Sequence, residues 1–227
     1  MTLERTRYLV GQVLGQDDLA QDQLYFREKA RRHNRTLHGW GVVCGLHVDQ
    51  GSSRAEVLVT PGYALDPYGE EIVIEREVTV DLCKEDRDGN AVVPCEAADD
   101  RSGAAVRIER SPGQPLYVAV EYAECHERPV PVVTSDAEET TEFSRVRESF
   151  AIKVLTQLPA TYSKPRAPAR RRRFARAKAE HQRNHRSCPE SPGEPCVILA
   201  DVVLDSNLEV ASIDPLTHRR YVASFAE

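Results

Sequence analysis

The sequence predicts a mainly β fold, an antiparallel sandwich or barrel, with one long N-terminal amphipathic helix. Only residues 16–39 carry apolar side chains at helical spacing over several turns. After them, short apolar or alternating stretches follow one another, with turn residues between them. No long helical stretch separates these segments, so a parallel sheet, which needs crossover helices, is not expected. An antiparallel sheet accounts for the pattern with the fewest elements.

The helix has a start signal, a stop signal and two different sides. Asp18 is the expected N-cap, with Gln21 three residues later as in a capping box. Gly39 suits the C-terminal cap. One side is apolar, and we expect it to be buried against the sheet. Its residues are Leu19, Phe26, Ala30, His33 and Leu37. Burial of this side predicts that Leu37→Asp prevents folding.

Strand patterns then occupy most of the chain. They cover residues 40–48, 55–60, 71–74, 77–82, 116–122, 147–155, 195–204 and 208–213. The last two flank Asp205, Ser206 and Asn207, which predicts a hairpin. Pro129 and Pro131 are expected to halt any strand ladder, because proline lacks an N–H donor.

This pattern suggests three parts. Residues 1–83 form an N-terminal helix and β-hairpin module, and residues 84–115 form a polar surface loop with a strand near 105–108. Residues 116–227 form a C-terminal β module that contains a basic insertion at 164–186.

Composition and charge argue against several classes of protein. The net charge of -6 argues against nucleic-acid binding through bulk charge. No window approaches 18 apolar residues, which excludes a transmembrane helix. The first residues do not read as a signal peptide, so we expect synthesis and first folding in the cytoplasm.

A structural zinc ion is the most specific hypothesis for a functional site. His181 and His185 are four residues apart, on one helical face, and Cys188 and Cys196 follow in a turn-rich segment. Cys125 with His126 offers alternative ligands. The competing interpretation is free thiols, or an oxidised Cys188–Cys196 pair. Among the other cysteines, Cys44 and Cys83 fit buried thiols best.

The basic insertion contains ten Lys or Arg residues and one Glu between residues 164 and 186. Its densest part consists of Arg170, Arg171, Arg172, Arg173 and Arg176. Such a run binds an anionic partner or is simply a solvated insertion. Phe174 is its single aromatic residue, so the stacking platform of a nucleic-acid site is missing and nucleic acid is not the expected partner.

Catalytic patterns are absent from the sequence. There is no Gly-x-Ser-x-Gly, no phosphate-binding Gly loop with its Lys, and no His-Glu-x-x-His. The acidic pairs at 70–71 and 99–100 fit solvated loop residues. A carbohydrate-acting enzyme would need two carboxylates facing one groove, about 5–10 Å apart, and nothing in the sequence indicates that groove. We therefore expect no enzyme.

Two segments carry a resemblance to a known family. They are residues 19–46 (LAQDQLYFREKARRHNRTLHGWGVVCGL) and residues 59–72 (VTPGYALDPYGEEI). They resemble proteins from gene clusters of phage-tail-like contractile injection systems, and N-terminal modules of phage baseplate and tail-fibre proteins. Residues 116–125, 143–150 and 196–202 look like the same family. The motif positions are Asn34, His38, Gly39, Gly41, Gly45, Asp66 and Gly69.

This resemblance implies a non-enzymatic structural subunit at the baseplate, at a fibre attachment or at the cap of such a particle. Its partners would be other structural subunits and copies of itself, it would need no cofactor, and it would be assembled into a phage-tail-like particle or virion. Gly39, Gly41 and Gly45 would allow strand and helix to approach closely. The alternative is a zinc-stabilised binding module whose Arg-rich arm binds an anionic partner.

Overall fold

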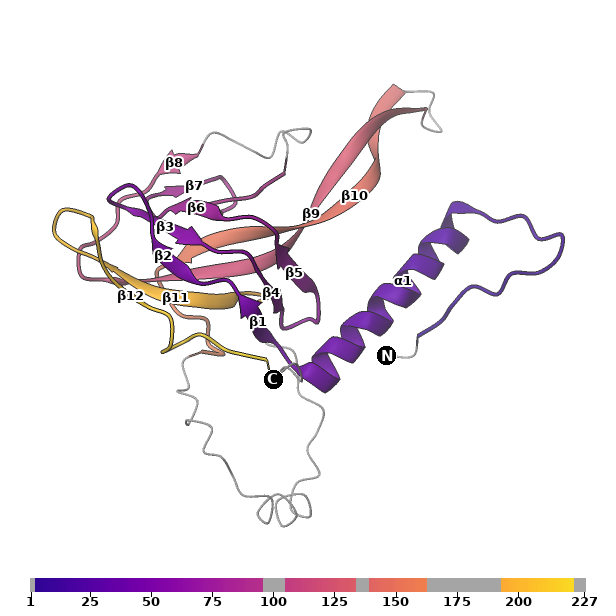
Figure 1. Ribbon diagram of the computed structural model, residues 1–227. Coiled ribbons are helices and arrows are strands. Elements are labelled where there is room, and N and C mark those ends of the chain that lie inside the picture. Colours follow the sequence, from indigo (N-terminus) through magenta and orange to yellow (C-terminus); the bar gives the residue numbers. More distant parts are fainter. Residues whose placement is uncertain (1–2, 96–104, 134–138, 163–192, 223–227) are drawn as a thin grey trace, which may run out of the picture.

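The computed structural model describes residues 3–95, 105–133, 139–162 and 193–222. The fold is mainly antiparallel β with one long N-terminal helix, as predicted (Figure 1). Helix α1 spans Gln16–His33 and continues into η1, a π-helical turn at Asn34–His38. The strands are β1 (Gly41–Gly45), β2 (Val48–Gln50), β3 (Glu56–Val59), β4 (Gly62–Leu65), β5 (Glu71–Ile74), β6 (Val78–Asp81), β7 (Lys84–Glu85), β8 (Val106–Arg107), β9 (Pro115–Val133), β10 (Glu139–Leu155), β11 (Val197–Leu204) and β12 (Val210–Asp214).

The ends of the helix differ slightly from the prediction. Gly15 is the N-cap, and Asp18 is the third helical residue, whose carboxylate accepts the Gly15 N–H at 3.0 Å. At the other end Gly39 terminates the π-helical turn with φ 77°, and its N–H donates to the Asn34 carbonyl at 3.0 Å. The expected stop signal is therefore confirmed, whereas Asp18 as N-cap was wrong by three residues.

Three multistranded sheets and a short ribbon make up the body. Their strand orders are β1-β4-β5, β2-β3-β6, β10-β9-β11-β12 and β7-β8, with every neighbouring pair antiparallel. The sheets pack on one another, since β5 contacts β9 and β10, β1 contacts β11, and β2 contacts β12. The predicted hairpin is confirmed as β11–β12. Asp205 holds its turn by accepting the N–H groups of Asn207 and Glu209.

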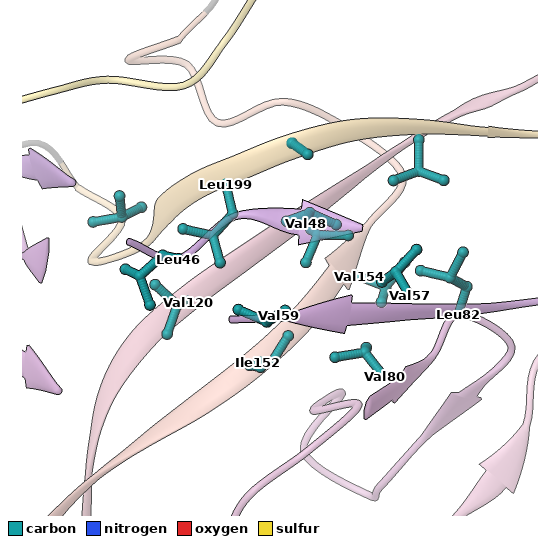
Figure 2. Close-up of a cluster of buried hydrophobic side chains, with 14 of the residues drawn as sticks. Leu46, Val48, Val57, Val59, Val80, Leu82, Val120, Ile152, Val154 and Leu199 are labelled. Carbon is teal, nitrogen blue, oxygen red and sulfur yellow. The ribbon is translucent and has the colours of Figure 1, made fainter. Parts of the chain in front are cut away.

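The hydrophobic core lies between these sheets (Figure 2). Val57 and Val59 of β3 point into it, as do Val118 and Val120 of β9 and Ile152 of β10, all fully buried. The inward residues recur every second position, as expected when one face of a strand is buried. The intervening residues of β9, Tyr117 and Ala119, belong to a second cluster with Tyr162, Cys196 and Ile198 on the opposite face.

Strands β9 and β10 extend beyond the sheet as a two-stranded arm (Figure 1). They pair from Tyr117 with Leu155 out to Val133 with Glu139, whereas β11 pairs only with the first part of β9. The prediction that Pro129 and Pro131 halt the ladder was wrong. Residues two apart present their backbone groups to the same side of a strand, so both prolines lose only a donor on the open edge.

The helix is not buried by the body, which corrects the prediction about its apolar side. No residue of α1 or η1 is buried. Leu19, Phe26 and Leu37 are 52%, 59% and 68% exposed, and Ala30 and His33 are exposed as well. The periodicity was identified correctly, but no part of the described chain buries this side.

This exposure reverses the expected effect of Leu37→Asp. We now expect the variant to fold and to lose less than about 1 kcal/mol of unfolding free energy, the cost of a carboxylate near a helix C-terminus. Leu46→Ala is the matched control, because Leu46 is fully buried. Leu46→Ala should lose about 2–5 kcal/mol of unfolding free energy. Chemical denaturation measures both, and a large loss for Leu37→Asp would show that the helix packs on the body.

Candidate functional site

The helix meets the body through a turn that connects β4 to β5. The Asp66 carboxylate accepts the N–H groups of Tyr68 and Glu70, both at 2.8 Å, and the Gly69 N–H donates to the Asp66 carbonyl at 3.0 Å. Aspartate often closes a turn in this way. Asp66 is only 2% exposed, and this burial raises the pKa of its carboxyl group to about 6, although the N–H donors favour the charged form.

Gly69 brings this turn against the backbone of α1. Its φ of +92° favours glycine, and a Cβ at this position would lie 2.2 Å from the Arg31 carbonyl oxygen. The Asn34 amide donates to the Gly69 carbonyl at 3.0 Å. Two positions of the sequence motif that are 35 residues apart, Asn34 and Gly69, are thus in direct contact.

Ion pairs surround this contact. Glu70 pairs with both Arg31 and Arg27, and Arg27 also pairs with Glu124 on β9. Glu28 completes the set by pairing with Arg31. Glu70, followed by Glu28, raises the pKa of Arg31 above its ordinary value. We call Asp66, Gly69, Glu70, Arg31 and Asn34 the helix anchor. It is a polar attachment that leaves the apolar side of the helix uncovered.

The remaining motif positions lie along the exit from the helix. The His38 and His33 rings approach to 3.3 Å between their Nε2 atoms. Gly41 faces the C-terminal segment, where a Cβ would lie 2.5 Å from the Arg220 carbonyl oxygen. Gly45 lies against Pro61, whose carbonyl oxygen would be 2.1 Å from a Cβ. These glycines permit close backbone approaches.

Sequence reasoning missed the role of Arg219. Its buried guanidinium donates to the carbonyls of Leu46, at 2.6 Å, and Leu199, at 3.2 Å, and also to that of Gly45. Burial lowers the pKa of Arg219 below its ordinary value. The side chain ties the C-terminal segment to the exit from β1, a contact that no local pattern predicts.

The predicted zinc ligands lie mostly outside the described residues, namely His181, His185 and Cys188. Cys196 is a free thiol, 2% exposed, and burial raises its pKa to about 12. Because the other three predicted ligands lie outside the described residues, the zinc site stays a prediction. Among the described residues, no cluster of three or more His, Cys, Asp or Glu side chains is arranged to hold a metal. Arg170, Arg171, Arg172, Arg173 and Arg176 also lie outside those residues.

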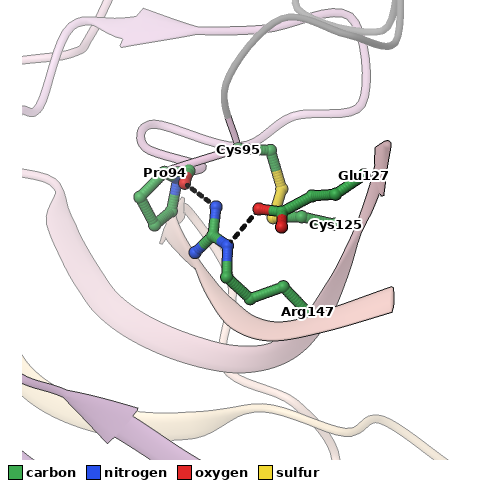
Figure 3. The surroundings of a disulfide bond; sticks show 5 residues. All are labelled: Pro94, Cys95, Cys125, Glu127 and Arg147. Carbon is green, nitrogen blue, oxygen red and sulfur yellow. Dashed lines mark hydrogen bonds and ion pairs between the residues drawn. A yellow bond between two sulfur atoms is a disulfide. The ribbon is translucent and has the colours of Figure 1, made fainter. Parts of the chain in front are cut away.

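Cys125 is not available as an alternative ligand, because it forms a disulfide with Cys95 (Figure 3). This bond holds the segment before Cys95 at the base of the arm. Arg147 of β10 strengthens the junction by pairing with Glu127 and by donating to the Pro94 carbonyl at 3.3 Å. Of the two cysteines predicted as buried thiols, Cys83 is buried and Cys44 is exposed.

An open groove lies beside this junction, between β5 and β10. Glu71, Glu75 and Glu148 line it together with Arg76 and Arg147. The Ser149 hydroxyl is buried there without a hydrogen-bond partner among the described residues. A nucleophile needs a base within hydrogen-bonding reach, and no such contact involves Ser149. The groove therefore offers mixed charge without an identifiable reacting pair.

Comparison with known proteins finds no matching family model and no matching curated protein. Solved structures are similar in shape. One is a chain of the type VI secretion system TssK–TssF–TssG baseplate subcomplex, at 12% identity and a TM-score of 0.43, covering 94% of this chain and 60% of that one. The crystal structure of TssK is 9% identical with a TM-score of 0.43, and the match covers 94% of this chain and 41% of TssK. This chain spans less than two thirds of either, and a likeness this distant carries no argument about function. Among the described residues, no helix has the length and apolar character needed to cross a bilayer.

The backbone contact at Gly69 predicts a substitution effect. Gly69→Ala should destabilise the protein by about 1–3 kcal/mol more than Gly113→Ala, because a methyl group meets the Arg31 carbonyl. Gly113 is the matched control, since its φ is +76° and nothing lies within 4 Å of its Cβ position. Denaturant unfolding measures both losses, and hydrogen exchange should show reduced protection in α1 for Gly69→Ala alone. Equal losses of stability in the two variants would show that the cost comes from the positive φ and not from the contact with Arg31.

The raised pKa of Asp66 predicts a pH dependence. The folded protein binds this proton more tightly than the unfolded chain, whose Asp pKa is about 3.9, so this group makes stability fall as pH rises from about 4 to 6. Asp66→Asn keeps the acceptor oxygen and removes the charge. It should raise Tm relative to wild type at pH 7.5 and less at pH 4.

Asp205→Asn is the control for that measurement, because Asp205 closes the same kind of turn at a less buried position. Its Tm difference from wild type should vary less with pH. A Tm difference for Asp66→Asn that is the same at both pH values would contradict the prediction.

Proposed function

We propose that the chain is a non-enzymatic structural subunit of a contractile, phage-tail-like injection particle, placed at the baseplate, at a fibre attachment or at the cap. It docks with other structural subunits and with copies of itself. The sequence resemblance of residues 19–46 and 59–72 supports the assignment to a contractile, phage-tail-like particle. The structure supports a role in assembly.

The observation that carries this proposal is the uncovered apolar side of α1. Leu19, Phe26 and Leu37 are 52%, 59% and 68% exposed, and neither α1 nor η1 contains a buried residue. Exposed apolar surface of this kind marks interaction sites in soluble proteins. The helix anchor holds the helix by polar contacts, so the apolar side stays free for another chain.

The arm is a second projecting element. Beyond the segment paired with β11, β9 and β10 pair with no other described strand, which leaves the open edge of β10 available along the arm. Unpaired edges are where strands of another chain add. The disulfide and Arg147 fix the base of the arm, so a partner meets a positioned ribbon.

The proposal is tested by deleting the gene in its host and imaging particles by electron microscopy. We expect absent or incomplete particles, restored by the wild-type gene. The variant Leu19→Asp/Phe26→Asp should fold and fail to restore them, because assembly needs the apolar side of α1. Leu216→Asp is the control, since Leu216 is 74% exposed on the body and should restore particles. Complete particles without the chain would overturn the proposal.

A further inference from the structure

One line of exposed residues runs the full length of α1. Its members are Gln16, Leu19, Gln23, Phe26, Ala30 and His33, and we call this line the seam. Successive members are three or four residues apart, the spacing of the a and d positions in a coiled coil. Every one of them is exposed.

The other sides of the helix already have contacts within the chain. On one side Arg27 and Arg31 reach Glu124 and Glu70 of the body. On another, the N-terminal segment lies along the helix: Thr6 donates to the Asp18 carbonyl at 2.9 Å, and the Gln21 amide donates to a backbone carbonyl of that segment at 2.8 Å. The seam is the side that these contacts leave open.

We propose that the seam pairs with the seam of a second copy of this chain, with the two helices antiparallel. This pairing rests on the proposed assembly function and names one contact within it. Full overlap of the two helices sets Gln16 against the partner's His33, since α1 spans Gln16–His33. In the same register Leu19 lies against the partner's Ala30, and Phe26 against the partner's Gln23. Each large side chain then meets a smaller one, and the polar residues at the helix ends meet each other.

Charge favours the antiparallel direction. The first half of the helix carries Asp17, Asp18 and Asp22, and the second half carries mostly basic residues, among them Lys29 and Arg32. An antiparallel pair sets the acidic half of each helix along the basic half of its partner, whereas a parallel pair aligns the two acidic halves and the two basic halves.

The charges that flank the seam show this most clearly. Asp22 and Lys29 are seven residues apart and lie on the same flank. In the antiparallel register Asp22 lies beside the partner's Lys29, and the contact occurs twice because the pair is symmetric.

The shape of the molecule accommodates this pair. The body lies at the C-terminal end of α1, and the helix extends away from it (Figure 1). The 18 residues of α1 give a helix about 27 Å long. Antiparallel pairing places the two bodies at opposite ends of that length, whereas parallel pairing would place them side by side.

The test is a charge exchange read by sedimentation velocity on the full chain. We expect the wild type to dimerise and each single variant, Asp22→Lys or Lys29→Asp, to weaken the dimer by about tenfold or more, because each creates two like-charge contacts. The double variant Asp22→Lys/Lys29→Asp exchanges the charges on both helices and should restore the wild-type Kd. Asp49→Lys, an equal charge change on the body, should leave it unchanged.

Circular dichroism and Tm confirm that each variant is folded, as expected for substitutions on an exposed helix. A wild type that stays monomeric, or a double variant that is no better than the singles, overturns the helix pair. So does a dimer that survives Leu19→Asp/Phe26→Asp. A monomeric wild type that still restores particles in the deletion strain would overturn the pair and leave the proposed function standing.

Discussion

The contact between the turn at residues 66–70 and the backbone of α1 fixes the direction in which the helix leaves the body. Ion pairs that are partly exposed contribute little energy and tolerate many geometries. The backbone approach at Gly69 is different, because the turn lies so close to the Arg31 carbonyl that not even a Cβ fits between them. Asp66 holds the turn in that arrangement, and Asn34 joins it to the helix. The ion pairs of Arg31 and Glu70 then stabilise a direction that sterics have already selected.

Within the described part of the chain there is one principal core, and the helix takes no part in it. Residues from β1 to β6 and from β9 to β11 form that core together. Arg219 lies at its edge and binds the carbonyls of Leu46, Leu199 and Gly45. The body therefore has no need of the helix for its burial. Because of this independence, the apolar side chains of α1 remain available to another chain while the fold stays intact.

Local signals predicted the elements well, whereas contacts between distant residues were not predictable. The strands follow from alternation, and the β11–β12 hairpin follows from Asp205 and Asn207. The anchor was not predictable, because nothing near residue 69 shows that the Arg31 carbonyl will lie against it. The disulfide joins cysteines 30 residues apart, and its pairing is a property of the folded sheet. The prolines of the arm were misjudged because strand edges are known only once neighbouring strands are placed.

The wrong prediction that the apolar side of α1 is buried has the most general cause. Periodicity of 3.6 residues shows that one side of a helix avoids water, and it is the same whether that side meets its own sheet or another molecule. Composition separates the two cases better. A side buried in a domain core tolerates few polar residues, whereas this seam contains Gln16, Gln23 and His33 and remains exposed at every position. A surface of this mixed composition can remain exposed to water and still offer the apolar contacts that the proposed helix pair requires.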